Sequence, residues 1–207
     1  MYKQKSFGIV LTIIFIVLIV VFLSLNKKIE NKPTVVGDSS ILSGEQATLG
    51  SWTSGTDGLK ERLNAIGLPA LSAEGSALHI HQHIDIFIHG KSIIVPAGIG
   101  IGFLDAFISP LHTHSADQVI HVESPTIQDF TLGQFFDVWG VKFSAQSIGG
   151  YDSDVENKIQ VFVNGKEQTG DPRAIILLSH QEIVVTFGTK NELPKVIPST
   201  YKFSIGE

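Results

Sequence analysis

The sequence contains no cysteine, and its only methionine is Met1. The absence of cysteine excludes disulfides, cysteine-ligated zinc, iron–sulfur clusters, c-type haem, blue-copper ligation and a lipid-modified cysteine. The absence of any other methionine excludes thioether copper sites, which disfavours Cu(I) chemistry. Any transition-metal site in this chain is therefore expected to use nitrogen and oxygen ligands.

Charged residues are also scarce, at 17% of the 207 residues, against about 25% in typical globular domains. Residues 7–25 form an uncharged apolar run that is long enough to cross a hydrocarbon core about 30 Å thick. No small-x-small cleavage site follows the run, so we predict an uncleaved single-pass signal anchor rather than a cleaved secretory signal. Lysines flank the run on both sides, and charge alone therefore does not orient it. Because most of the chain follows the run, we expect the C-terminal domain to lie outside the cytoplasm.

The chain after the predicted anchor is acidic. Residues 1–32, the anchor and its flanks, hold five of the 15 basic and one of the 20 acidic residues, so the remainder has a net charge of −9. Such a domain has no electrostatic reason to bind nucleic acid or anionic lipid. Residues 33–57 are rich in small polar residues without periodicity and predict a flexible stalk. Residues 58–207 are predicted to form an extracytoplasmic, histidine-rich β domain, and the sequence identifies no protein partner.

Alternation of apolar and polar residues dominates this predicted domain. In residues 79–89, Ile84, Ile86 and Ile88 fall on one strand face while the histidines and Asp85 fall on the other. Residues 119–123 alternate in the same way and place His121 beside Glu123. Further strands are predicted at residues 158–163, 174–178, 182–187 and 201–205.

Two short helices are predicted among these strands. One covers residues 57–66, capped by Thr56 or Asp57, and the other covers residues 132–139 behind a capping box of Thr131 and Gln134. The sequence therefore predicts a mainly β fold, with α+β as the alternative. We expect a compact, largely antiparallel β domain with one or two short helices.

An internal repeat supports this fold. Residues 84–91 (IDIFIHGK) match residues 159–166 (IQVFVNGK) at an offset of 75 positions. In each copy an alternating strand ends at a glycine, which permits the positive φ of a hairpin turn. The repeat predicts two hairpins, with His89 in the turn position that Asn164 takes in the second copy.

Histidines give the main functional signal, since seven of the eight lie between His79 and His121. His-x-His spacing on a strand places two imidazoles on the same side, roughly 6–7 Å apart along the chain, which suits two ligands of one metal ion. A single histidine is more often a surface or structural residue. A cluster of uncoordinated imidazoles, however, would repel on protonation in mild acid. The cluster therefore predicts a nitrogen-rich site for Cu(II) or Zn(II).

The same region resembles a known but uncharacterised family of small membrane-anchored or exported proteins. The resemblance covers about residues 79–141 and is carried by four ordered blocks: residues 81–88 (HQHIDIFI), 111–114 (LHTH), 119–124 (VIHVES) and 130–136 (FTLGQFF). The resemblance implies no activity. It favours the histidines within these blocks over His79 and His89 as metal ligands. The predicted metal ligands are thus His81, His83, His112, His114 and His121. Glu123 and Asp85 are predicted as alternative ligands or as carboxylates that orient the histidines.

Three functions agree with this pattern. The first is a membrane-anchored metal-binding domain for capture, storage or delivery of copper or zinc. The second is a zinc- or copper-dependent enzyme with three histidines, such as His81, His83 and His121, and an open coordination position. The third is a surface interaction module with a structural metal or none. No catalytic residue is assigned, and no dinucleotide or phosphate-binding motif predicts an organic cofactor.

Overall fold

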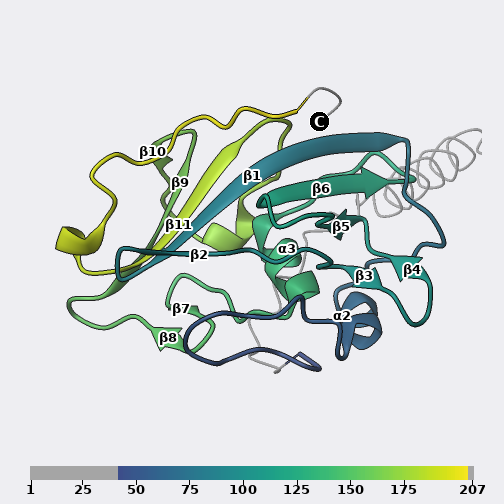
Figure 1. Cartoon of the computed structure of the whole chain (residues 1–207), viewed down its shortest axis with the longest axis horizontal. Coiled ribbons are helices and arrows are strands. Elements are labelled where there is room, and N and C mark those ends of the chain that lie inside the picture. The colour runs from purple at the N-terminus through teal and green to yellow at the C-terminus, as the bar shows by residue number, and fades with distance from the viewer. Residues whose placement is uncertain (1–41, 205–207) are drawn as a thin grey trace, which may run out of the picture. The chain divides into compact units, whose positions relative to one another are not determined.

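A computed structural model describes residues 42–204 of the chain (Figure 1). The predicted anchor and residues 33–41 of the predicted stalk lie outside the described residues. Within residues 42–204, no helix combines the length and the apolar character that crossing a bilayer requires.

A seven-stranded mixed sheet organises the domain, in the order β10-β9-β11-β1-β6-β5, with β2 paired to the end of β1. Its strands are β1 (Leu78–Ile88), β2 (Lys91–Ile93), β5 (Leu111–His112), β6 (Val119–Ser124), β9 (Lys158–Val163), β10 (Lys166–Glu167) and β11 (Glu182–Gly188). All neighbouring pairs are antiparallel except the parallel pair β1–β11. The sheet is mixed but largely antiparallel, as predicted. The parallel pair was not predicted, because alternation within a strand does not report the direction of its neighbour.

Smaller elements complete the domain. Two-stranded sheets form from β3 (Ile101–Gly102) with β4 (Phe107–Ile108) and from β7 (Ser147–Ile148) with β8 (Tyr151–Asp152). Within residues 42–204 the helices are α2 (Leu59–Ala65) and α3 (Leu132–Trp139), with 3₁₀ turns η1 (Pro172–Ala174) and η2 (Lys190–Glu192).

Helix α3 confirms the predicted capping box. The Thr131 hydroxyl accepts from the Gln134 N–H at 3.3 Å, and the Gln134 side chain accepts from the Thr131 N–H at 2.9 Å. Helix α2 is shorter than predicted, because the chain enters it through Gly58 in the left-handed conformation, without a side-chain cap. The prediction that Thr56 or Asp57 caps this helix was therefore wrong.

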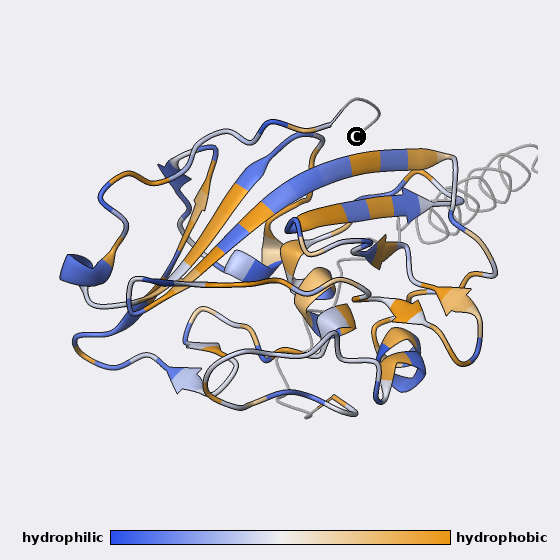
Figure 2. Ribbon diagram, viewed as in Figure 1, coloured by the Kyte–Doolittle hydropathy of each residue, from blue (hydrophilic) through white to orange (hydrophobic). Residues whose placement is uncertain are grey.

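The sheet has two chemically different faces, which appear in Figure 2 as alternating bands along β1 and β6. Ile84, Ile86 and Ile88 are buried in the core that also contains Phe135 and Trp139 of α3. Burying each such side chain contributes about 1.5–3 kcal/mol, so this face holds the sheet against the helix. The other face of β1 carries the histidines and Asp85.

Both copies of the internal repeat form hairpins. β1 joins β2 through His89 and Gly90, with φ of 48° and 73°, and β9 joins β10 through Asn164 and Gly165, with φ of 51° and 75°. Two positive φ values in a two-residue loop are typical of a type I′ turn. His89 therefore has the turn role that the repeat predicted.

Other segments differ from the predicted elements. Residues 174–178 are not a strand, because Asp171 caps the 3₁₀ turn η1 at Pro172, and only an isolated bridge at Ile176 follows. Residues 201–204 also lack strand structure, and residue 205 lies outside the described part of the chain. Residues 42–57, from the predicted stalk, pack with the domain: Trp52 is 4% exposed within the core.

Candidate metal centre

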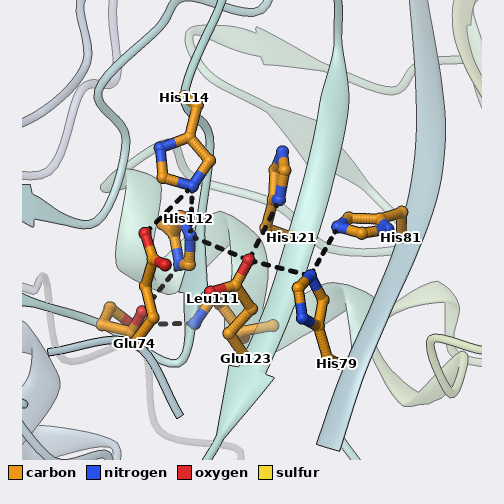
Figure 3. Close-up of polar contacts among 9 residues, drawn as sticks. Glu74, His79, His81, Leu111, His112, His114, His121 and Glu123 are labelled. Carbon is orange, nitrogen blue, oxygen red and sulfur yellow. Dashed lines mark hydrogen bonds and ion pairs between the residues drawn. The ribbon is translucent and has the colours of Figure 1, made fainter. Parts of the chain in front are cut away.

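Three neighbouring strands bring the histidines together on the face of the sheet opposite the core. His81 of β1 lies across from His121 of β6, and His79 lies across from Glu123. His112 of β5 pairs with His121 from the other side. His114 follows two residues after His112, so its side chain joins the same group (Figure 3). We refer to the following six residues as the histidine cluster: His79, His81, His112, His114, His121 and Glu123.

The histidine cluster contains two close imidazole pairs. The Nε2 atoms of His79 and His81 are 3.2 Å apart, and those of His112 and His114 are 3.1 Å apart. Two nitrogens bound to one ion at 2.0–2.1 Å in tetrahedral geometry are separated by about 3.3 Å. Each pair is therefore spaced as two ligands of a single ion would be.

Glu123 lies between the two pairs. Its Oε1 is 3.3 Å from His79 Nε2, 3.3 Å from His121 Nδ1 and 3.9 Å from His112 Nε2. Together with Glu123 and His121, each imidazole pair forms a four-residue group whose potential ligand atoms all lie within 4.8 Å of one another. The histidine cluster is thus two overlapping ligand groups that share one imidazole and one carboxylate.

Burial keeps two of these imidazoles neutral. Desolvation, with smaller contributions from neighbouring histidines, lowers the pKa of His112 to about 4 and the pKa of His121 to about 3. Desolvation also raises the pKa of the Glu123 carboxyl. Because the neutral imidazole is the form that binds a metal, His112 and His121 are ready to coordinate at pH 7 without losing a proton.

Hydrogen bonding orients His112 for coordination. Its Nδ1 lies 2.9 Å from the Ser109 carbonyl oxygen. An Nδ1–H that donates to this carbonyl leaves the Nε2 lone pair directed at His114 and Glu123. A backbone carbonyl on the second ring nitrogen is the arrangement usual for metal-bound histidine.

The histidine cluster is open to solvent at its edges. The side chains of His79 and His114 are 51% and 41% exposed, whereas that of His112 is fully buried. Glu74, an exposed residue that no sequence pattern marks, places Oε1 3.3 Å from His114 Nε2. It precedes β1 in irregular structure.

Comparison of the chain with protein-family models, curated proteins and solved structures gave no match.

The structure separates two of the predicted ligand residues from the others. His83 and Asp85 lie further along β1 and group with Glu182 of β11 rather than with the histidine cluster. His83 and His81 share a face, but His83 lies across from Val119 on β6, which offers no ligand. Of the predicted ligands, the structure brings together His81, His112, His114, His121 and Glu123.

Sequence reasoning also set aside or missed two residues of these groups. His79 was passed over, yet it pairs directly with Glu123 in the sheet register. Glu182 was not singled out, although one acidic residue at the start of the apolar strand EIVVTFG was a usable signal. Its proximity to His83 depends on the parallel β1–β11 pair, which the sequence does not reveal.

We expect the metal-free protein to lose stability as the pH falls below about 6.5. Unfolded histidine takes up a proton near 6.5, whereas folded His112 does so only near 4, so the free energy of unfolding falls with pH through this interval. At about 1.4 kcal/mol per pH unit, His112 alone accounts for about 3 kcal/mol. Glu123 and Glu182 act in the opposite direction at pH values above 4.5, the ordinary pKa of a glutamate. Because folding raises their pKa values, the stability that they contribute is lost as the pH rises.

The contribution of His112 to this pH dependence is measured by urea denaturation in the presence of a chelator at several pH values. The difference between the parent and His112→Gln should grow smaller as the pH falls, because the variant has no imidazole to protonate. His89→Gln, at an exposed turn, serves as the control. Identical pH dependence in the parent and His112→Gln would contradict the prediction.

Proposed function

We propose that this domain binds a transition-metal ion, Cu(II) or Zn(II), through the histidine cluster, and that it captures, stores or delivers that ion. The observation that carries the proposal is the convergence of two His-x-His pairs and His121 on one buried carboxylate, Glu123. Buried polar groups at this density have a large desolvation cost. A bound cation offsets that cost and gives the neutral imidazoles a common partner.

The choice of ion follows from the ligand chemistry. Five imidazoles and one carboxylate form a nitrogen-rich site without sulfur, which suits Cu(II) and Zn(II) better than Mg²⁺ or Ca²⁺. Cu(II) binds most strongly of the divalent first-row ions, and Zn(II) accepts the tetrahedral geometry that each imidazole pair supports.

Exposure favours an exchangeable ion over a closed structural one. His79 and His114 form the accessible edge, and His112 and Glu123 form the buried floor. An ion held between them can enter and leave from the solvent side. One set of three histidines that the sequence suggested for an enzyme, His81, His83 and His121, does not come together, because His83 belongs to a different group. The accessible edge therefore supports capture and release over an enzyme built on that set.

The location of the domain is part of the same proposal. The uncharged apolar run of residues 7–25 supports a single membrane anchor. With the domain outside the cytoplasm, the histidine cluster would meet extracytoplasmic copper or zinc. We also propose that the chain belongs to the uncharacterised family that its four sequence blocks resemble.

The test is metal content by mass spectrometry on the full chain in detergent, purified without a histidine tag. The parent should retain at least about one equivalent of Cu(II) or Zn(II) after incubation and desalting. The variant His79→Asn/His114→Asn should lose most of it while keeping its circular dichroism spectrum, since both side chains are half-exposed. The matched control His89→Asn/His180→Asn changes two histidines outside the histidine cluster and should retain the metal. A parent that holds neither ion would overturn the proposal.

A further inference from the structure

A second group of potential ligands lies beside the histidine cluster on the same sheet face. It consists of His83 and Asp85 of β1 and Glu182 of β11, with potential ligand atoms all within 4.8 Å of one another. The parallel register places His83 directly across from Glu182. The His83 ring is stacked on the Tyr201 ring, with centroids 3.8 Å apart and planes 5° apart. The C-terminal segment therefore covers this group.

Glu182 is buried with part of its carboxyl group unsatisfied. The residue is 1% exposed, and its Oε2 lies 2.9 Å from His83 Nδ1. Among residues 42–204, its Oε1 has no hydrogen-bond donor, and the carboxyl group nearest to Glu182 is that of Asp85. A buried carboxylate oxygen without a partner costs more than a lost hydrogen bond between neutral groups. This oxygen is therefore an acceptor without a donor in the part of the chain that the structure describes.

The second carboxyl group increases the need for a positive charge. Asp85 is half-buried, and its Oδ1 accepts from Gln118 Nε2 at 3.2 Å. Burial raises the pKa of Glu182, the contact with His83 opposes this rise, and Asp85 adds to it, because two carboxylates in one site repel when both are ionised. His83 provides one possible donor, but it reaches only one oxygen of Glu182.

We propose that His83, Asp85 and Glu182 form a second cation site, separate from the histidine cluster, that takes a divalent ion of the Mn²⁺ class. One imidazole and two carboxylates make a harder ligand set than the histidine cluster, and carboxylate-rich sites suit Mn²⁺. The 2.9 Å separation of His83 Nδ1 and Glu182 Oε2 is near the distance of about 3 Å expected for two adjacent ligands on one ion. This proposal uses none of the residues of the histidine cluster and does not depend on it.

The test is Mn²⁺ binding to the full chain, measured by loss of the electron paramagnetic resonance signal of free Mn²⁺. The parent and His79→Asn/His114→Asn should bind about one Mn²⁺ with equal affinity, and Glu182→Gln should bind at least about tenfold more weakly. Asp85→Asn, at a half-buried position, is the second variant and should also bind more weakly. The circular dichroism spectrum of each variant verifies folding.

The outcomes separate this proposal from the function proposed above. Mn²⁺ binding that is unchanged in Glu182→Gln and Asp85→Asn, or absent from the parent, would overturn the second site and leave the histidine cluster untouched. Loss of Mn²⁺ in His79→Asn/His114→Asn alone would assign the ion to the histidine cluster and equally overturn the second site. Conversely, Mn²⁺ lost only in Glu182→Gln and Asp85→Asn supports the second site, even if the parent binds no Cu(II) or Zn(II).

Discussion

The variant His121→Gln is expected to bind Cu(II) or Zn(II) at least about 100-fold more weakly than the parent, or about 2.7 kcal/mol. His121 belongs to both overlapping ligand groups. Its ring centroid lies 4.5 Å from those of His81 and His114 and 5.3 Å from that of His112. Mutating a residue that only hydrogen-bonds to a metal ligand typically lowers metal affinity 10–100-fold. Removing a ligand that both groups share should therefore lower the affinity at least about 100-fold.

Competition titration against a chromophoric chelator measures this change. His79→Asn and His114→Asn each alter only one of the two groups, and we therefore expect smaller losses from them than from His121→Gln. His89→Asn, at the β1–β2 turn, should bind as the parent does. Parent-like affinity in a folded His121→Gln variant would show that the two groups do not share this ligand.

The second large effect is expected at Arg62, where substitution by methionine should lower the free energy of unfolding by about 3–5 kcal/mol, because buried carbonyls lose their donor. Arg62 is fully buried in α2, and its guanidinium donates to five backbone carbonyls. These carbonyls belong to Ser43, Gly55, Asp57, Asp137 and Val138.

The position of these carbonyls explains the size of the effect. Asp137 and Val138 lie in the last turn of α3, where the helix dipole favours a positive charge, and the Asp137 carbonyl also accepts from the N–H of Gly140 at the C-cap. The other three carbonyls come from the chain that leads into α2. Methionine keeps the unbranched apolar stem of the side chain but has no guanidinium. All five carbonyls therefore lose this donor, and α2, α3 and residues 43–57 are no longer joined by it.

Urea denaturation of the metal-free protein checks this prediction. Because domains of this kind are stabilised by about 5–15 kcal/mol in total, Arg62→Met should shift the midpoint strongly or unfold the domain. Lys60→Met is the matched control, since Lys60 lies exposed in the same helix, and it should change stability by less than about 0.5 kcal/mol. If Arg62→Met changed the free energy of unfolding as little as Lys60→Met, water would satisfy the five carbonyls as well as the guanidinium does, and the prediction would be wrong.

The sequence by itself determined the features that depend on neighbouring residues. Strand alternation placed the histidines and Asp85 on one face of β1 and Ile84, Ile86 and Ile88 on the other. The capping box at Thr131 placed the start of α3, and the glycine turns placed two hairpins. Each of these signals is local, because it depends on backbone geometry within a few residues. The absence of cysteine likewise limited the ligand chemistry to nitrogen and oxygen.

Only the tertiary structure decided which of these residues meet. The pairing of β1 with β6 placed His79 opposite Glu123, and the parallel pairing with β11 placed His83 opposite Glu182, 99 positions later in the chain. The burial of Arg62 beneath carbonyls from three segments was equally invisible in the sequence. The physical reason is that side-chain periodicity belongs to a single strand or helix. The partner strand and its register are instead selected by long-range burial of the apolar face, which fixes the position of every polar residue on the other side.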